Sequence, residues 1–190
     1  MSAKQSESLI LIWRIAELQA RQLNAGEIEP YHLLLAISKC VDLDLTTIVP
    51  KDTANRDEIL EQLLREVRRI RTIFRVANFD AKIFRRKLRK ALPGIPEKRF
   101  AMPDAEPLHR SAATKKQFTE AQHFAELSDQ TVYPVHLLLA VLCTHEQCSD
   151  DVMRELGIDK KHVEKIAKRE IFTTRPTGFS LGGDTKRGRN

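Results

Sequence analysis

Apolar residues recur along much of the chain at steps of three and four, which is the spacing of one face of an amphipathic helix. The pattern predicts helices over residues 9–23, 52–75 and 80–92, a short helix over 42–49, and a last helix that begins after Asp159. Alternation typical of strands is scarce, and glycine occurs only seven times in 190 residues. The sequence therefore predicts an all-α fold.

Two segments depart from the amphipathic pattern because they are apolar on every side. The heptapeptide Pro30–Ala36 returns 104 residues later as Pro134–Ala140, with His-Leu-Leu-Leu-Ala in both copies. Continuous apolarity predicts a helix buried all round, and proline suits the first turn of a helix. The preceding helix repeats too, because Phe118 corresponds to Trp13 at an offset of 105. The chain is therefore expected to contain two copies of one helical unit.

The repeat divides the chain into four segments. Residues 5–75 form the first unit, 76–107 a basic helix and proline-rich connector, 108–171 the second unit, and 172–190 a basic, glycine-rich tail. The tail is expected to be mobile because it has little apolar surface to bury. The predicted architecture is thus two pseudo-symmetric four-helix units with an extended basic helical insertion between them. In this alignment the short helix at 42–49 corresponds to residues around Val152 and Leu156 of the second unit.

The net charge of +6 is concentrated in the middle of the chain. Residues 56–99 alone carry a net charge of +8, so the rest of the chain sums to −2. The basic helices within 56–92 fit three interpretations: a solvated face, a surface for an acidic protein partner, or a nucleic-acid surface. Acidic residues are interspersed and aromatic residues are not, which favours a solvated face. The candidate binding residues on these helices are Arg68, Arg69, Arg85 and Arg86.

The two decapeptides Ile28–Ile37 and Val132–Val141 resemble the double repeat of the Clp N-terminal domain, which stands at the front of Clp-type AAA+ unfoldases. The resemblance covers about residues 5–171. It implies an all-α pseudo-dimer and a protein-binding role, since family members use this domain to receive substrates or adaptor proteins. The expected partners are Clp ATPase or protease subunits, adaptors or substrates. The chain would be a free-standing adaptor or regulator, or the N-terminal domain of a Clp ATPase subunit.

The residue before each motif histidine departs from part of the family. Some of these unfoldases carry Glu there, where it helps to read phosphorylated arginine, whereas this chain has Tyr31 and Val135. Neither side chain can pair with a guanidinium, so phosphoarginine recognition is not expected. Tyr31 and Val135 remain candidate partner-binding residues. The surfaces where the two units meet, and the ends of their first helices, are the expected docking surfaces.

Histidine and cysteine offer weak signals for a metal. His32 and His136 each lie three residues into a buried helix, and neither has a Cys, Asp or Glu at ligand spacing. With Pro30 and Pro134 they are interpreted as a structural motif, in which a core histidine bonds to the preceding helix or loop. The grouping Cys143, His145 and Cys148 supplies at most three ligands, whereas structural zinc sites use four. No metal and no cofactor are predicted.

Catalysis is also not expected. The segment 178–183 has the glycine spacing of a phosphate-binding loop, but Asp184 stands where lysine is required, so no ATPase is predicted. No serine lies in a nucleophile-elbow context. Three cysteines without a disulfide framework, and no signal peptide or membrane span, predict a soluble cytoplasmic protein without a membrane partner.

Overall fold

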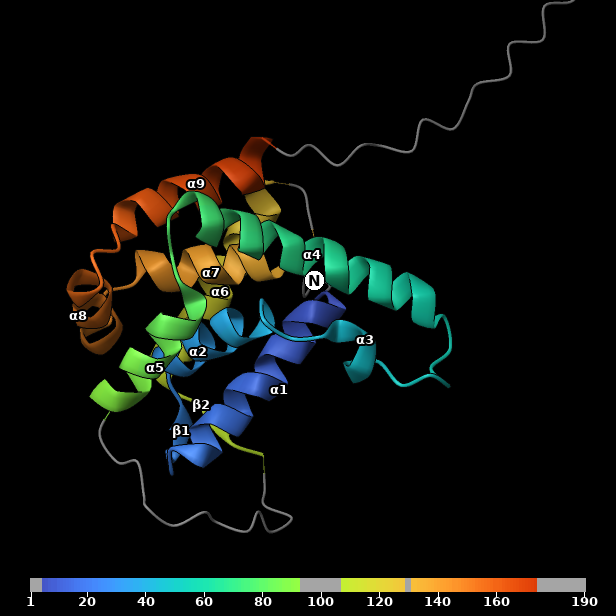
Figure 1. The fold of residues 1–190 in the computed structure, drawn as a ribbon, viewed down its shortest axis with the longest axis horizontal. Helices are drawn as coiled ribbons and strands as arrows, with labels where there is room; N and C mark the ends of the chain where they lie inside the picture. Colours follow the sequence, from blue (N-terminus) through green and yellow to red (C-terminus); the bar gives the residue numbers. More distant parts are fainter. Residues whose placement is uncertain (1–4, 93–106, 129–130, 174–190) are drawn as a thin grey trace, which may run out of the picture.

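The computed structural model describes residues 5–92, 107–128 and 131–173. The elements in these ranges are, in chain order, α1 (Glu7–Gln22), β1 (Glu27–Ile28), α2 (Pro30–Cys40), α3 (Leu45–Ile48), α4 (Arg56–Val76), α5 (Ala81–Ala91), β2 (His109–Arg110), α6 (Ala112–Leu127), α7 (Pro134–Cys143), α8 (Gln147–Glu155) and α9 (Lys160–Thr173) (Figure 1). The all-α prediction is confirmed. Most of the connector and of the tail, including the segment 178–183, lies outside the described residues.

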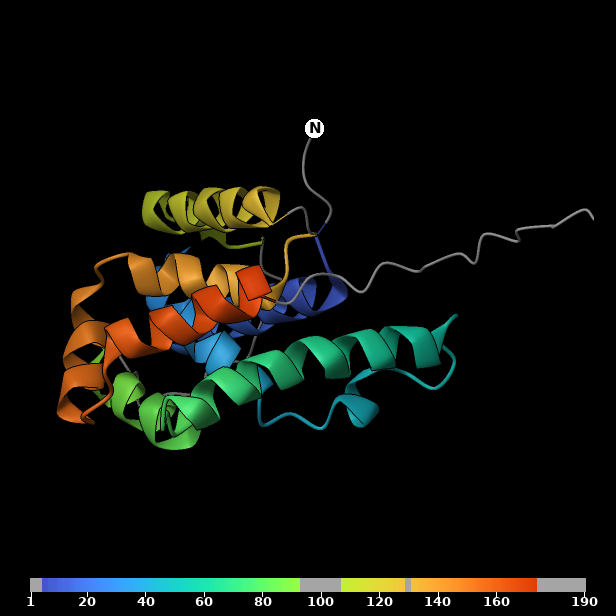
Figure 2. The ribbon, with the colours of Figure 1, turned by 90° about the horizontal axis from the view of Figure 1, so that it is seen from above.

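The two apolar repeats form the centre of the molecule. Every residue from Pro134 to Leu142 in α7 is buried, and in α2 only Lys39 is exposed. These two helices contact each other, while α1 packs against α2 and α6 packs against α7. Figure 2 shows the resulting layers, with α6 on one side of the central helices and α4 on the other. The prediction that both repeats are sequestered helices is confirmed.

Short strand pairs join the two units in a reciprocal way. The backbone N–H of Ser6, before α1, donates to the carbonyl of Val132, before α7, at 3.2 Å. Ser111, before α6, donates to Ile28, before α2, at the same distance. The parallel pairs are Gln5 with Val132, Glu27 with His109, and Ile28 with Arg110. Adding 105 to the first-helix residues and 104 to the second-helix residues converts one set of contacts into the other, so the units are related by a rough two-fold axis.

The ends of the units also match, but at a different offset. Asn78 after α4 and Gly157 after α8 are both left-handed, with φ of 53° and 67°, and lie 79 residues apart. Two residues later, Asp80 and Asp159 accept backbone N–H bonds at the start of α5 and α9. α5 packs against α2, and α9 packs against α7. The alignment of residues 42–49 with 152–156 is therefore wrong, because the counterpart of α8 is the end of α4.

This correspondence affects the boundary of the first unit. α5 occupies the place on α2 that α9 occupies on α7, so it behaves as the last helix of a unit and not as an insertion. The segment without a counterpart is the four-residue α3 together with the first turns of α4. We propose that the first unit extends to residue 92, in place of the boundary at 75 that the sequence suggested.

Candidate protein-docking surface

Equivalent aromatic residues of the two units meet on the two-fold axis. Trp13 of α1 and Phe118 of α6 lie edge to face, with ring centroids 5.7 Å apart and an angle of 76° between the rings. Both side chains are half-buried. In a symmetric pair, equivalent residues touch only close to the axis, so this contact marks where the axis reaches the surface.

Arg110 lies against both rings. Its guanidinium carbon is 5.5 Å from the centre of the Trp13 ring and 5.2 Å from that of Phe118. Such cation–π contacts contribute about 0.5–1 kcal/mol each at exposed sites. Arg110 is itself exposed and forms no ion pair within the described residues. The rings are thus held in place by a cation whose outer side remains available to a partner.

Two further apolar residues lie on or next to the elements that carry these side chains. Ile10, one turn before Trp13 on α1, is 37% exposed. Leu108, just before β2, is half-buried, and its N–H donates to the carboxylate of Glu17 at 3.3 Å. We call Ile10, Trp13, Leu108, Arg110 and Phe118 the axial surface. It offers aromatic and aliphatic contact area with one positive charge, which suits an apolar polypeptide segment and contains no nucleophile or acid–base pair.

The residues before the motif histidines are less accessible than the sequence suggested. Val135 is only 1% exposed, so its prediction as a partner-binding residue is corrected. Tyr31 is half-buried, its ring centroid lies 4.3 Å from that of His32, and burial raises the pKa of its phenol. The axial surface, which contains neither residue, was only partly foreseen, since the equivalence of Trp13 and Phe118 was visible in the repeat.

The four candidate arginines do not form one site. Arg85 is 8% exposed and donates to the carbonyl of Ser38 and the carboxylate of Asp42, so it secures α5 to the end of α2. The prediction that Arg85 belongs to an exposed basic face is wrong. Arg69 is half-buried and donates to the backbone carbonyl of Glu170 at 2.6 Å. Only Arg68 and Arg86 are exposed and, within the described residues, without an ion pair.

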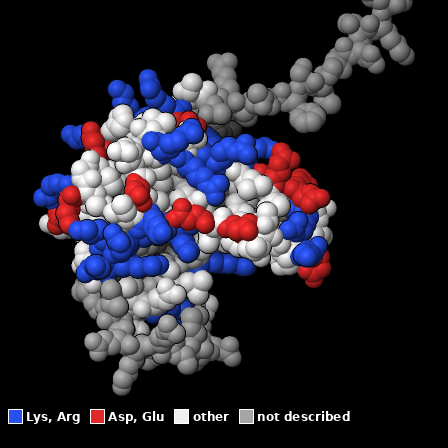
Figure 3. Space-filling model, in the orientation of Figure 1, with Lys and Arg blue, Asp and Glu red and all other residues white. Residues whose placement is uncertain are grey.

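The remaining basic side chains are spread over several elements. Figure 3 shows Lys and Arg gathered along α5 and along α4 and α9, with Asp and Glu between these bands. On α5, Lys87 pairs with Glu155, and Arg89 donates to the side chain of Gln19 at 3.2 Å. The basic surface is therefore divided, and part of it is engaged within the molecule.

The motif histidines act as backbone acceptors. Nδ1 of His32 accepts the N–H of Glu29, and Nδ1 of His136 accepts the N–H of Tyr133, both at 2.9 Å. Burial lowers the pKa of each imidazole to about 4, and for His136 the charge of Arg69 adds to the effect. The prediction of core histidines bonded to the preceding loop is confirmed.

Within residues 5–92, 107–128 and 131–173, no group of three or more His, Cys, Asp or Glu side chains is placed to hold a metal ion. His145 contacts Asp150 at 2.6 Å, while Cys143 is exposed and does not continue the buried face of α7. In the same ranges, no helix combines the length and apolarity needed to cross a bilayer.

Comparison with known proteins gives matches among solved structures. A structure from "Preliminary structural investigations of a malarial protein secretion system" has a TM-score of 0.61 and 18% identity, over 90% of this chain and 97% of that chain. The Hsp104 N-terminal domain from Candida albicans has a TM-score of 0.57 and 19% identity, over 86% of this chain and 89% of that chain. No family model and no curated protein sequence matches. At these identities the similarity shows a fold like that of the Hsp104 N-terminal domain.

Proposed function

We propose that the chain is a non-enzymatic protein-binding module of the Clp unfoldase and protease system, which docks substrates or adaptor proteins on the axial surface. The observation that carries the proposal is the half-buried pair of Trp13 and Phe118, built from equivalent helices and contacted by the exposed Arg110. The likeness of the fold to the Hsp104 N-terminal domain supports the same role. The module would act as a free-standing adaptor or regulator, or as the N-terminal domain of a Clp ATPase subunit.

The composition of the axial surface suits weak, reversible capture of polypeptide. Tryptophan and arginine are enriched among residues that dominate binding energy at protein interfaces. Burying apolar surface contributes about 25 cal/mol per Å², and an area this small gives a modest affinity. Modest affinity matches a delivery role, in which the bound protein must be released.

The chain contains a built-in reporter for this test, because Trp13 is its only tryptophan. Titration with α-casein, a protein without stable structure, is expected to change the emission of Trp13 saturably. Phe118→Ala is expected to weaken binding at least ten-fold, since it removes half of the aromatic pair. The matched control is Leu127→Ala, also on α6, where the side chain is 61% exposed and outside the axial surface.

Two results would contradict the proposal. One is emission that does not respond to α-casein while binding is detected calorimetrically, because the contact would then lie elsewhere. The other is an equal loss of affinity in the Phe118 and Leu127 variants. Circular dichroism of each variant, compared with the unchanged protein, separates loss of binding from loss of fold.

The basic helices support an alternative, in which residues 56–92 bind nucleic acid or an acidic partner. Its structural support is reduced, because Arg85 and Arg69 are engaged inside the molecule. The alternative predicts affinity for a 20-nucleotide single strand that falls steeply between 50 and 200 mM salt (about 10³-fold or more for a protein with many phosphate contacts). Exchange of both Arg68 and Arg86 for Glu would abolish it, whereas docking on the axial surface would be unaffected.

A further inference from the structure

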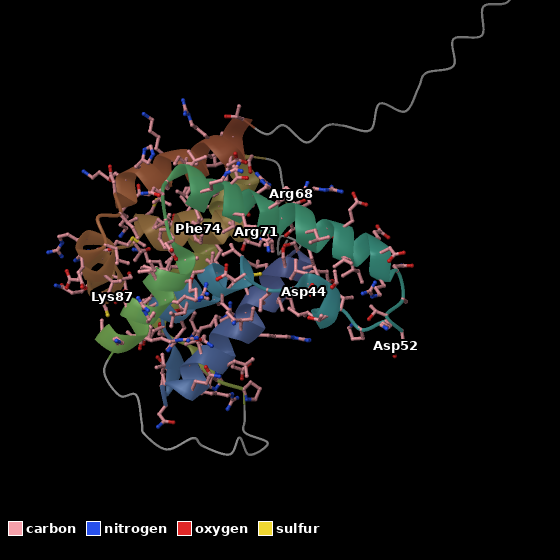
Figure 4. The ribbon with its side chains drawn as sticks, in the orientation of Figure 1. Asp44, Asp52, Arg68, Arg71, Phe74 and Lys87 are labelled. Atoms are coloured by element: carbon pink, nitrogen blue, oxygen red, sulfur yellow. The ribbon has the colours of Figure 1, made fainter. Side chains whose placement is uncertain are left out.

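A small groove opens on the face opposite α6, at the junction of the loop after α2, the last turns of α4 and the start of α5. Its volume is about 260 Å³. The floor is apolar, because Phe74 and Phe79 are buried and stack with ring centroids 4.3 Å apart. Arg71 and Arg75 lie one turn apart on α4 and line the opening. Figure 4 labels Arg71 and Phe74 on this part of α4.

The two arginines are not neutralised. Arg71 donates from Nε to the carbonyl of Val41 at 2.6 Å, which fixes its side chain beside the groove. Neither Arg71 nor Arg75 forms an ion pair with any described residue, and like charges four residues apart on a helix repel each other. Asp42 also borders the groove, but its carboxylate already accepts from Arg85. The site therefore has an uncompensated positive charge above an aromatic floor.

In the second unit, an ion pair occupies the position equivalent to this groove. At the offset of 79 residues, Ala81 corresponds to Lys160 and Arg71 corresponds to Asp150. Lys160 reaches across and donates to the carbonyl of Thr144 at 2.9 Å and to the carboxylate of Asp150 at 2.6 Å. The ion pair of Lys160 with Asp150 thus occupies in the second unit the position that is open and cationic in the first.

Arg75, the second arginine of the groove, also has a counterpart that is neutralised in the second unit. Arg75 corresponds to Arg154, which pairs with Asp151. The residue of the first unit that corresponds to Asp151 is Thr72, which cannot neutralise Arg75. Both acidic partners found in the second unit are therefore missing in the first.

We propose that this groove binds the C-terminal carboxylate of a polypeptide whose last side chain is apolar. A terminal residue carries its carboxylate and its side chain on one carbon, so the first can meet the guanidinium groups while the second contacts Phe74 and Phe79. Charge-assisted bonds from arginine to carboxylate are roughly twice as strong as neutral ones. Whole-ligand pockets usually have about 300–1,000 Å³, so the groove fits a single residue. An internal acidic side chain would leave the apolar floor empty.

The test uses the whole chain, labelled with ¹⁵N, and the peptide acetyl-Gly-Ser-Gly-Ser-Leu with either a free acid or an amide at its end. The free acid is expected to shift the backbone signals of Val41, Arg75 and Ala81, and to bind at least ten-fold more tightly than the amide. The double variant Arg71→Asp/Ala81→Lys copies the ion pair of Asp150 with Lys160 and is expected to abolish binding without changing the helix content. Arg68→Gln, on the same helix but outside the groove, serves as the control and is expected to bind normally.

Three outcomes would overturn the proposal: equal affinity for acid and amide, full binding by the double variant, or equal binding of an amidated peptide with an internal glutamate. The last would mean that the groove binds acidic side chains. This site does not depend on the axial surface. Because Phe118→Ala should spare the peptide shifts, and the double variant should spare the response of Trp13 to α-casein, failure of either proposal can be recognised separately.

Discussion

The imidazoles of His32 and His136 are the buried groups whose charge matters most for folding. Each is fully buried and accepts a backbone N–H through Nδ1, which requires a neutral ring. In both, burial lowers the folded-state pKa from 6.5 to about 4. An unfolded chain therefore binds protons at these rings between pH 6.5 and 4, while the folded chain does not.

The contribution of these two histidines to the free energy of unfolding is expected to be fully present above pH 6.5. It should fall as the pH drops toward 4, by roughly 3 kcal/mol for each histidine at most. Urea midpoints measured from pH 7.5 to 4.5 test this. His136→Gln keeps an acceptor for the N–H of Tyr133, because glutamine serves at this position of a helix start. That variant should lose about half of the pH dependence, and His162→Gln, at an exposed position of α9, serves as the control. Equal slopes in all three proteins would contradict the prediction.

Gln117 is a polar side chain in an apolar place. It is fully buried on α6, and neither atom of its amide has a hydrogen-bond partner within the described residues. The equivalent residue of the first unit, 105 positions earlier, is Ile12. Gln117→Leu is expected to raise the free energy of unfolding by about 1–2 kcal/mol, because an unpaired buried amide costs that much.

The measurement is denaturant unfolding at pH 7.5, with Gln122→Leu as the matched control. Gln122 lies on the same helix, but its amide donates to Glu126 at 3.1 Å. The control should be neutral or slightly destabilising. A loss of stability in the Gln117 variant would show that its amide is satisfied.

The prediction of residue burial succeeded where the helical pattern is strong. It failed where a charged side chain finds its partner on a distant element. The core positions Leu63, Val67 and Ile70 of α4 follow from spacing alone, and all are buried. From the sequence, Arg85 is assigned to a basic face because its partners, Ser38 and Asp42, lie more than forty residues away. Only the packing of α5 on α2 brings them together.

At the scale of elements, the turn after α4 explains why the sequence placed the boundary of the first unit at 75, whereas we propose 92. Its left-handed residue is Asn78, whereas the second unit has Gly157, and asparagine is a weaker sequence signal than glycine. The extra segment, which comprises α3 and the first turns of α4, also shifts the offset between units from 104 to 79. Helix existence was thus predictable from apolar spacing, but the correspondence between helices needed the packing.

The same turn allows a direct prediction. Asn78→Ala is expected to destabilise the protein by about 1 kcal/mol, because alanine tolerates φ near +53° less well than asparagine does. Asn78→Gly should be neutral or mildly stabilising, as glycine fills this position in the second unit. Thermal unfolding of the two variants checks the order, and an alanine variant as stable as the glycine variant would contradict it.

At the scale of the molecule, each unit supplies the strand that the other unit pairs with. Ser6 bonds to Val132, and Ser111 bonds to Ile28. The central helices α2 and α7 also contact each other. The repeat in the sequence predicted two copies around sequestered helices, but which faces would meet followed only from these pairings. For that reason the contact of Trp13 with Phe118 could not be predicted, although their equivalence could.

The reciprocal pairing predicts that both units unfold together. Trp13 emission, which reports on the contact between the units, and far-UV circular dichroism, which reports on all helices, are expected to give one urea midpoint. Leu137→Ala, at a fully buried position of α7, should reduce the free energy of unfolding by about 2–5 kcal/mol. Both midpoints should therefore fall by the same amount. Midpoints of emission and circular dichroism that separate in this variant would mean that the units unfold independently.

The contact on the two-fold axis bears on how such a chain arises. In a dimer of identical subunits, a residue on the axis meets its own copy, and any mutation changes both sides at once. Duplication and fusion into a single polypeptide remove that restriction, so each copy can evolve alone. Tryptophan facing phenylalanine on the axis, and arginine at position 71 where the other half has aspartate at 150, are differences that a single fused chain can carry and a dimer of identical subunits cannot.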